Sequence, residues 1–272
     1  MSILERKNNM LLEERIKKLE STFNEGSEKV FSLYLNVDPR DPEQQGGKWK
    51  IRLKKALSTL EESTKNSTSN EGKNQAKAVR EKVENFIHGK ANEFKRGLIL
   101  FATADENLWV SFDLNIPVTS EFHWDNSPHF EQLKLLLKKH PYSGLLILQQ
   151  DKAQLIETEM GKLLNTSYYQ LDLETDNWKQ HQGSESNDLI RGGSKRDEFN
   201  ERVKAHQDRW FKNLAEKIQK KAKESNWKQF HLIGEREEVE HLKSYFTRKI
   251  DKIVPRNLLG RNANQIIEET FK

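Results

Sequence analysis

The strongest constraint on the fold is one long apolar stripe in the second half of the chain. Its members recur every three or four residues, at Phe199, Val203, His206, Trp210, Leu214 and Ile218. This spacing is typical of one face of an α-helix, and a helix from Lys195 to about Lys223 is the longest that the sequence predicts. Such a face must be covered by other apolar elements, which the flanking segments have to supply.

The flanking segments predict an α/β domain. In chain order, we expect strands at 144–150, 152–158, 168–173, 230–234 and 250–254, and helices at 239–246 and 263–271. Residues 174–194 are polar and contain three glycines, so we expect a mobile loop there that contributes nothing to a core. Strands that alternate with helices are typical of the α/β class.

The first half predicts a second α/β domain. In chain order, we expect a helix at 4–19, a strand at 30–37, a helical hairpin at 49–60 and 76–87, strands at 97–102, 108–114 and 117–122, and a last helix. That last helix should begin at Ser127-Pro128, because serine caps a first turn and proline fits its first position. A chain of 272 residues is long enough for two domains, which we place at 1–143 and 144–272.

Composition narrows the class of protein. The chain has no cysteine, which excludes disulfides and thiolate metal sites and favours a reducing compartment. With 34% hydrophobic and 32% charged residues, it predicts folded domains with heavily charged surfaces. We find neither a signal peptide nor an apolar run that could cross a bilayer. The sequence therefore predicts a cytoplasmic protein that does not act at a membrane.

The positive charge is concentrated in one segment. The net charge is +4, yet residues 191–228 hold twelve Lys or Arg against six Asp or Glu. A basic stripe of this kind is what a nucleic-acid backbone attracts, since lysine and arginine neutralise phosphates. A solvated helix face explains the same charge, so both interpretations stay open at this point.

The order of elements, with a glycine-bearing loop directly before a long basic helix, resembles the archaeo-eukaryotic class I release factors. The loop ends in Arg191-Gly192-Gly193-Ser194, where that family carries a Gly-Gly-Gln motif. Further similar segments are 31–36, 97–101, Ile116-Pro117, Asp125-Asn126, Phe130 and 144–148. The resemblance spans nearly the whole chain. It implies a release-factor-like N-terminal domain followed by an RNase H-like domain of peptidyl-tRNA hydrolase type.

The resemblance implies that Gly192, Gly193 and Ser194 are the catalytic segment. In the family this loop enters the peptidyl-transferase centre of the large ribosomal subunit, where the ester between a nascent peptide and tRNA is hydrolysed. Glycines lack a Cβ and can approach the ribose closely, and a backbone N–H at the third position can stabilise the oxyanion. Ser194 replaces the family's glutamine and cannot place an amide there, although its backbone N–H is retained.

The partners that the resemblance implies are the ribosome and tRNA, not DNA. The residues expected to meet RNA phosphates flank the loop or lie on the following helix: Arg191, Lys195, Arg196, Arg202, Lys204 and Arg209. Two glutamines of the same loop, Gln180 and Gln182, are alternatives for the missing motif glutamine.

Two departures from the family point away from stop-codon reading. Ser67 to Gly72 stands where termination factors carry their Asn-Ile-Lys-Ser sequence, and 101–104 lacks the cysteine-bearing decoding motif. The chain ends where the central domain of the family closes, so we expect no third domain. A codon-independent role in ribosome rescue or quality control, as in the Vms-like and bacterial branches, fits this pattern.

Three functions stay open from the sequence. The first is a peptidyl-tRNA hydrolase that frees nascent chains on stalled or split ribosomes. The second, favoured by Ser194, is a non-hydrolytic factor of Pelota or hibernation type that occupies the tRNA site. The third is an α/β interaction protein whose basic helix contacts another partner.

No cofactor or metal is expected. The chain has no phosphate-binding GxxxxGK[ST], no GxGxxG after a strand and no HExxH. His123, His129 and His140 show no carboxylate or histidine partner at metal-ligand spacing, so we expect structural roles for them. His206 lies on the apolar stripe and should be a core residue.

Overall fold

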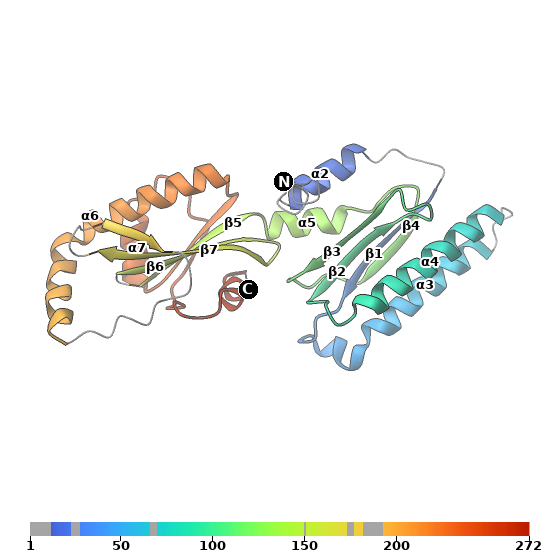
Figure 1. The fold of residues 1–272 in the computed structure, drawn as a ribbon, viewed down its shortest axis with the longest axis horizontal. Coiled ribbons are helices and arrows are strands. Elements are labelled where there is room, and N and C mark those ends of the chain that lie inside the picture. The colour runs from blue at the N-terminus through green and yellow to red at the C-terminus, as the bar shows by residue number, and fades with distance from the viewer. Residues whose placement is uncertain are drawn as a thin grey trace. The chain divides into compact units, whose positions relative to one another are not determined.

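The computed structural model describes residues 12–22, 28–65, 70–149, 151–172, 177–181 and 193–271. The chain divides into two compact units, Met1–Leu137 and Lys138–Lys272 (Figure 1). Each unit contains one sheet with helices, which confirms the predicted α/β class. In the part of the chain that is described, no helix is long and apolar enough to cross a membrane.

The first unit is built on a four-stranded antiparallel sheet with the order β3-β2-β1-β4. Its elements are α2 (Leu12–Thr22), β1 (Val30–Asn36), the 3₁₀-helix η1 (Pro42–Gly47), α3 (Trp49–Lys65), α4 (Asn70–Lys90), β2 (Gly97–Ala102), β3 (Trp109–Leu114), β4 (Glu121–Asp125) and α5 (Glu131–Lys139). The expected helical hairpin is present as α3 and α4, which lie along one face of the sheet (Figure 1).

Strand alternation gives the two faces of this sheet different roles. Phe31, Leu33 and Leu35 of β1 pack with α3 and α4 in one apolar core, together with Phe122 and Trp124 of β4. Because successive side chains of a strand point to opposite faces, the residues between them face the other side. That second face carries polar side chains of both strands, including Ser32 of β1 and His123 of β4.

The second unit has a six-stranded mixed sheet with the order β10-β9-β5-β6-β7-β8. Its elements are β5 (Ser143–Gln149), β6 (Lys152–Glu159), β7 (Lys162–Asp172), β8 (Asn177–His181), α6 (Gly193–Ser225), β9 (Gln229–Ile233), α7 (Arg236–Lys243), β10 (Lys252–Val254) and α8 (Ala263–Phe271). β5 pairs antiparallel with β6 and parallel with β9, and β9 is parallel to β10. Without the edge strand β8, this is the order three-two-one-four-five of an RNase H-like sheet.

Both faces of the second sheet are covered, which explains the continuous apolar run of β5. Leu146 and Leu148 pack with α6 and α7, whereas Leu145 and Ile147 pack with α8. A strand that is buried on both faces has no polar side, so its sequence does not alternate.

At Gly144, the backbone of β5 lies in close contact with the ring of Trp227. A Cβ atom at this position would lie 2.4 Å from Cε3 of Trp227, which follows α6 in the chain. Only glycine leaves room for the indole ring, which is itself buried.

Several expected boundaries are wrong. The strand expected at 117–122 is β4 at Glu121–Asp125, and the strand expected at 168–173 is β7 at Lys162–Asp172. Within residues 174–194, expected to be a loop, Asn177–His181 form strand β8, which pairs with β7. Helix α6 begins at Gly193, so Gly193 and Ser194 belong to its first turn and not to the loop. Helix α5 begins at Glu131 and not at Pro128, which leaves residues 126–130 as a connection between β4 and α5.

Candidate functional site

Helix α6 begins at the predicted glycine motif. Gly193 and Ser194 are its first two residues, and the helix continues to Ser225. The first four N–H groups of an α-helix have no acceptor within the helix, and the aligned peptide dipoles make this end positive. Such an end stabilises an anion, including the oxyanion that forms when water attacks an ester.

The described apolar contacts of α6 lie in the second half of the helix. The first buried residue described on the helix is Trp210, followed by Phe211, Leu214 and Ile218. At about 1.5 Å per residue, Gly193 lies about 25 Å along the helix from Trp210. In Figure 1 this first part of α6 changes direction and leaves the sheet. The second half of α6 is therefore the part that the described core holds against the sheet.

Polar contacts fix the second half of α6 to its neighbours. Asp208 Oδ1 accepts a hydrogen bond of 2.8 Å from the Tyr245 hydroxyl and lies 2.7 Å from His241 Nε2. These two contacts hold the pKa of Asp208 below its ordinary value. Gln219 accepts hydrogen bonds from the backbone and hydroxyl of Thr247, at 2.8 Å and 2.6 Å. The helix is thereby tied to α7 and the segment after it.

The far end of α6 is fixed by Glu157, a carboxylate of β6 that sequence reasoning missed. Glu157 accepts hydrogen bonds from Tyr142 at 2.6 Å, Trp227 at 2.9 Å and Asn165 at 2.8 Å. Nζ of Lys221, on α6, lies 3.5 Å from its Oε2. Burial alone would raise the pKa of Glu157, but these donors and Lys221 outweigh it and lower the pKa. We call this set the Glu157 network.

The structure places only part of the predicted site. Arg191, Gly192 and Gln182 lie outside the described residues. The backbones of Lys195, Arg196, Arg202 and Lys204 belong to α6, while their side chains are outside the description. Arg209 is exposed on the same helix.

Two other predictions on this region are corrected by the geometry. Gln180 is not at the helix start, because it lies in β8 and donates a hydrogen bond of 3.2 Å to Ser167 of β7. His206 is half-buried next to Trp210, with ring centroids 6.1 Å apart, and is not a core residue.

Sequence comparison identifies the family. The sequence model described as "Bacterial archaeo-eukaryotic release factor family 5" matches residues 141–272, which is the second unit from just before β5 to the end. The uncharacterized protein YocB of Bacillus subtilis (strain 168) is 31% identical over 263 residues, spanning 97% of this chain and 99% of that protein. The chain belongs to the bacterial archaeo-eukaryotic release factor family.

Solved structures resemble this family member only distantly. An archaeal protein is 14% identical, with 96% of this chain and 73% of that chain covered and a TM-score of 0.30. The archaeal translation termination factor aRF1 is also 14% identical, with 95% and 72% covered and a TM-score of 0.31. Scores of this size do not establish a common fold, so the assignment rests on the sequence matches.

Family membership makes this protein a release-factor-like component of translation that acts with the ribosome. The family model covers the unit that carries α6, and the similarity to YocB spans both units. The basic helix that begins at the glycine motif is therefore part of the matched region.

The first unit of this release-factor-like protein contains a polar cluster that the sequence analysis excluded. His129 Nε2 lies 2.7 Å from Asp125 Oδ2, and the His129 ring stacks on the His123 ring with centroids 3.9 Å apart. The expectation that these two histidines have no carboxylate or histidine partner is wrong. It failed because residues 126–130 are not helical and fold His129 back over the sheet. His140, in contrast, is buried beside Phe271.

Proposed function

We propose that this protein places its Gly192-Gly193-Ser194 segment at the acceptor end of a tRNA in the peptidyl-transferase centre. There it hydrolyses peptidyl-tRNA on stalled or split ribosomes without reading a codon. The observation that carries the proposal is the start of α6 at Gly193, about 25 Å along the helix from its first described buried residue. A probe of that reach suits a narrow, RNA-walled centre.

The helix start also supports the chemistry. The attacking water produces a tetrahedral oxyanion, and backbone N–H groups in the first turn of α6 can stabilise it. Glycine at position 193 allows the ester to approach the backbone, because no Cβ stands in the way. The basic residues Lys195, Arg196, Arg202, Lys204 and Arg209 follow on the same helix and would meet phosphates of tRNA or ribosomal RNA. Arg191 precedes it in the chain.

A second function is favoured by Ser194. Serine cannot place an amide where the family's glutamine side chain shapes the pocket of the attacking water. The alternative is a non-hydrolytic factor that occupies the tRNA site on an idle or stalled ribosome. Both functions need the same helix start and the same basic residues, and they differ only in bond cleavage.

Release from large ribosomal subunits that carry peptidyl-tRNA tests the proposal. Wild-type protein should release the labelled peptide, and Gly193→Ala should release it at least tenfold more slowly. Alanine is a better helix former than glycine, so a slower variant cannot be explained by a weaker helix. Gly89→Ala is the matched control, because Gly89 also lies in a helix and a Cβ there meets nothing within 4 Å.

Ser194→Gln separates the two functions. If the wild-type protein hydrolyses the ester, glutamine should keep or increase the rate. Co-sedimentation with ribosomes at physiological salt, without release by the wild type and with release gained by Ser194→Gln, would establish the second function instead. Absence of both co-sedimentation and release would contradict both.

A further inference from the structure

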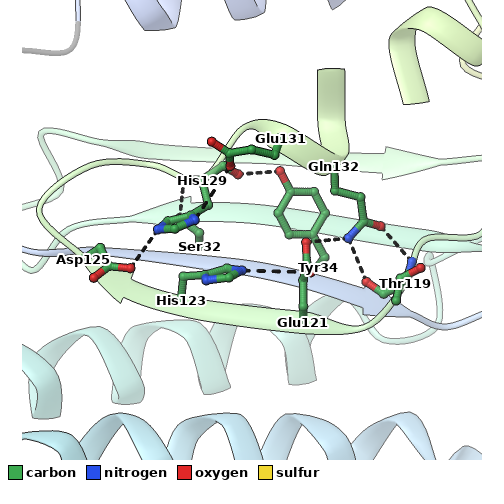
Figure 2. Close-up of polar contacts among 9 residues, drawn as sticks. All are labelled: Ser32, Tyr34, Thr119, Glu121, His123, Asp125, His129, Glu131 and Gln132. Atoms are coloured by element: carbon green, nitrogen blue, oxygen red, sulfur yellow. Dashed lines mark hydrogen bonds and ion pairs between the residues drawn. The ribbon is translucent and has the colours of Figure 1, made fainter. Parts of the chain in front are cut away.

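We propose that His123, Asp125 and His129 form a binding site for a divalent transition-metal ion of the zinc type. The three side chains lie on the face of the first sheet opposite α3 and α4 (Figure 2). Their ligand atoms all lie within 4.8 Å of one another. In the part of the chain that is described, this is the one group of three or more such residues that converges in this way.

Strand geometry brings the first two ligands together. His123 and Asp125 are alternate residues of β4, so both side chains point to the same face. Trp124 between them points to the core with α3 and α4. The connection 126–130 then turns back and sets His129 over the same strand (Figure 2).

Two buried side chains of the neighbouring strand hold His129 in place. The backbone N–H of His129 donates to Ser32 Oγ at 3.1 Å, and the Tyr34 hydroxyl donates to the His129 carbonyl at 2.6 Å. Both Ser32 and Tyr34 lie on β1 and are fully buried. Ser32 also pairs directly with His123 across the sheet. One rigid strand therefore positions both histidines, which is the preorganisation that a binding site needs.

The donor set suits zinc more than magnesium or calcium. Two imidazole nitrogens and one carboxylate oxygen are ligands of Zn²⁺, Ni²⁺ and Cu²⁺, whereas Mg²⁺ and Ca²⁺ prefer oxygen alone. Zinc sites with three protein ligands of this kind keep a fourth position for water. With ligand bonds of about 2.0 Å, neighbouring ligand atoms in a tetrahedral site lie about 3.3 Å apart. The two imidazole rings are stacked with their planes 5° apart, so at least one ring has to rotate to aim its nitrogen at a shared ion.

Two further carboxylates surround the group and fit the role of outer partners. Glu131 Oε2 lies 3.7 Å from Nδ1 of His129, and Glu121 Oε2 lies 4.0 Å from Nε2 of His123. Gln132 of α5 donates to Glu121 at 2.6 Å and so fixes that carboxylate. Carboxylates that accept from the second nitrogen of a ligating histidine orient the ring and strengthen the metal bond. They also add negative charge near the cation.

A matched pair elsewhere in the chain lacks the second imidazole. His241 Nε2 lies 2.7 Å from Asp208 Oδ1, the same separation as in the His129–Asp125 pair. The third group there is the hydroxyl of Tyr245. The two pairs therefore differ in whether a second metal-binding nitrogen is at hand, which makes Asp208 the natural control.

Zinc binding by the full chain, prepared without a histidine tag and treated with a chelator, tests the proposal. Isothermal titration with ZnCl₂ should show one site per chain with micromolar or tighter affinity. His123→Gln, His129→Gln and Asp125→Asn should each weaken binding at least tenfold, whereas Asp208→Asn should change it less than twofold. Absence of the site in the wild type, or unchanged binding by all three cluster variants, would overturn the proposal.

A measurement on the wild-type protein covers the case in which a variant fails to fold. The chain has eight histidines. In ¹⁵N-labelled protein, Zn²⁺ should shift the imidazole ¹⁵N resonances of His123 and His129 among these eight. Shifts confined to other histidines would contradict the proposal. MgCl₂ at the same concentration should leave all of the imidazole signals in place.

Discussion

The two units differ in how deeply a key carboxylate is buried and in how many of its hydrogen-bonding positions are occupied. In the second unit the Glu157 network is buried, and both carboxylate oxygens of Glu157 are occupied by donors on four neighbouring side chains. In the first unit, Asp125 faces His129 but is more than half exposed. A buried group whose partners are all present holds the fold, whereas exposed groups that converge with free lone pairs can bind a ligand.

Histidines show the same contrast. His231 of β9 is buried, and neither ring nitrogen has a hydrogen-bond partner among the described residues. Burial lowers the pKa of His231 to about 4. His129 is partly exposed and faces Asp125, His123 and Glu131. The same residue type is thus a core residue in one unit and a candidate ligand in the other, and the surroundings decide which.

The largest expected effect is the acid sensitivity of the second unit. His231 is neutral when folded but takes up a proton in the unfolded chain below its ordinary pKa of 6.5. The unfolded state therefore binds more protons, and stability falls as the pH drops from 6.5 toward 4. At about 1.36 kcal/mol per pKa unit, the loss is about 3 kcal/mol.

Urea unfolding followed by pulsed hydrogen exchange in β9 measures this loss at a series of pH values. Carboxylates titrate in the same range, so the informative quantity is the difference between the wild type and His231→Leu. That variant should be less sensitive to acid by about 3 kcal/mol. His88→Gln, at an exposed position on α4, should behave as the wild type. An equal pH dependence in His231→Leu and the wild type would contradict the burial argument.

The second effect is the cost of disturbing the Glu157 network. Glu157→Gln replaces one acceptor oxygen by an NH₂ group, which is itself a donor. In one orientation of the amide this group faces the donors Asn165 and Lys221, and in the other it faces Tyr142 and Trp227. Leaving buried donors without an acceptor costs about 2 kcal/mol. Because the folded state lowers the pKa of Glu157, its contribution is present above the ordinary value of 4.5 and is lost below it.

Urea unfolding at neutral pH, resolved by hydrogen exchange in β6, measures the cost of Glu157→Gln. The transition of the first unit should stay unchanged in this variant. A shift in the first unit, or none in the second, would show that Glu157 does not hold α6 to its sheet.

Most of the fold followed from the sequence because local patterns decide it. The segment 144–150 predicted a strand, and the stripe from Phe199 to Ile218 predicted a long helix; both are present, as β5 and α6. The helix was expected to start at Lys195 because Gly193 and Ser194 are weak helix formers. In the structure these two residues belong to the first turn of α6. β8 was missed because an edge strand with polar residues looks like a loop.

The sites were harder to predict because they depend on contacts between distant segments. Ser32 and Tyr34 hold His129 from almost one hundred residues away in the chain, at separations of 97 and 95 residues. No local pattern shows that contact. The one available pattern, two histidines with Asp125 between them, was hidden by the expected helix at Ser127-Pro128. Glu157 gave no pattern at all, since its partners are scattered along the chain: Tyr142 just before β5, Asn165 of β7, Lys221 of α6 and Trp227.

The smallest expected effect is a change in the stability of the first unit, and it tests the contrast between Asp125 and Glu157 most directly. Asp125→Asn removes a carboxylate that is more than half exposed and leaves no buried donor without an acceptor. With a chelator present, the free energy of unfolding of the first unit should change by less than about 0.5 kcal/mol. Urea unfolding resolved by hydrogen exchange in β4 measures it. A loss as large as that of Glu157→Gln would mean that Asp125 holds the fold and that the two units do not differ as described.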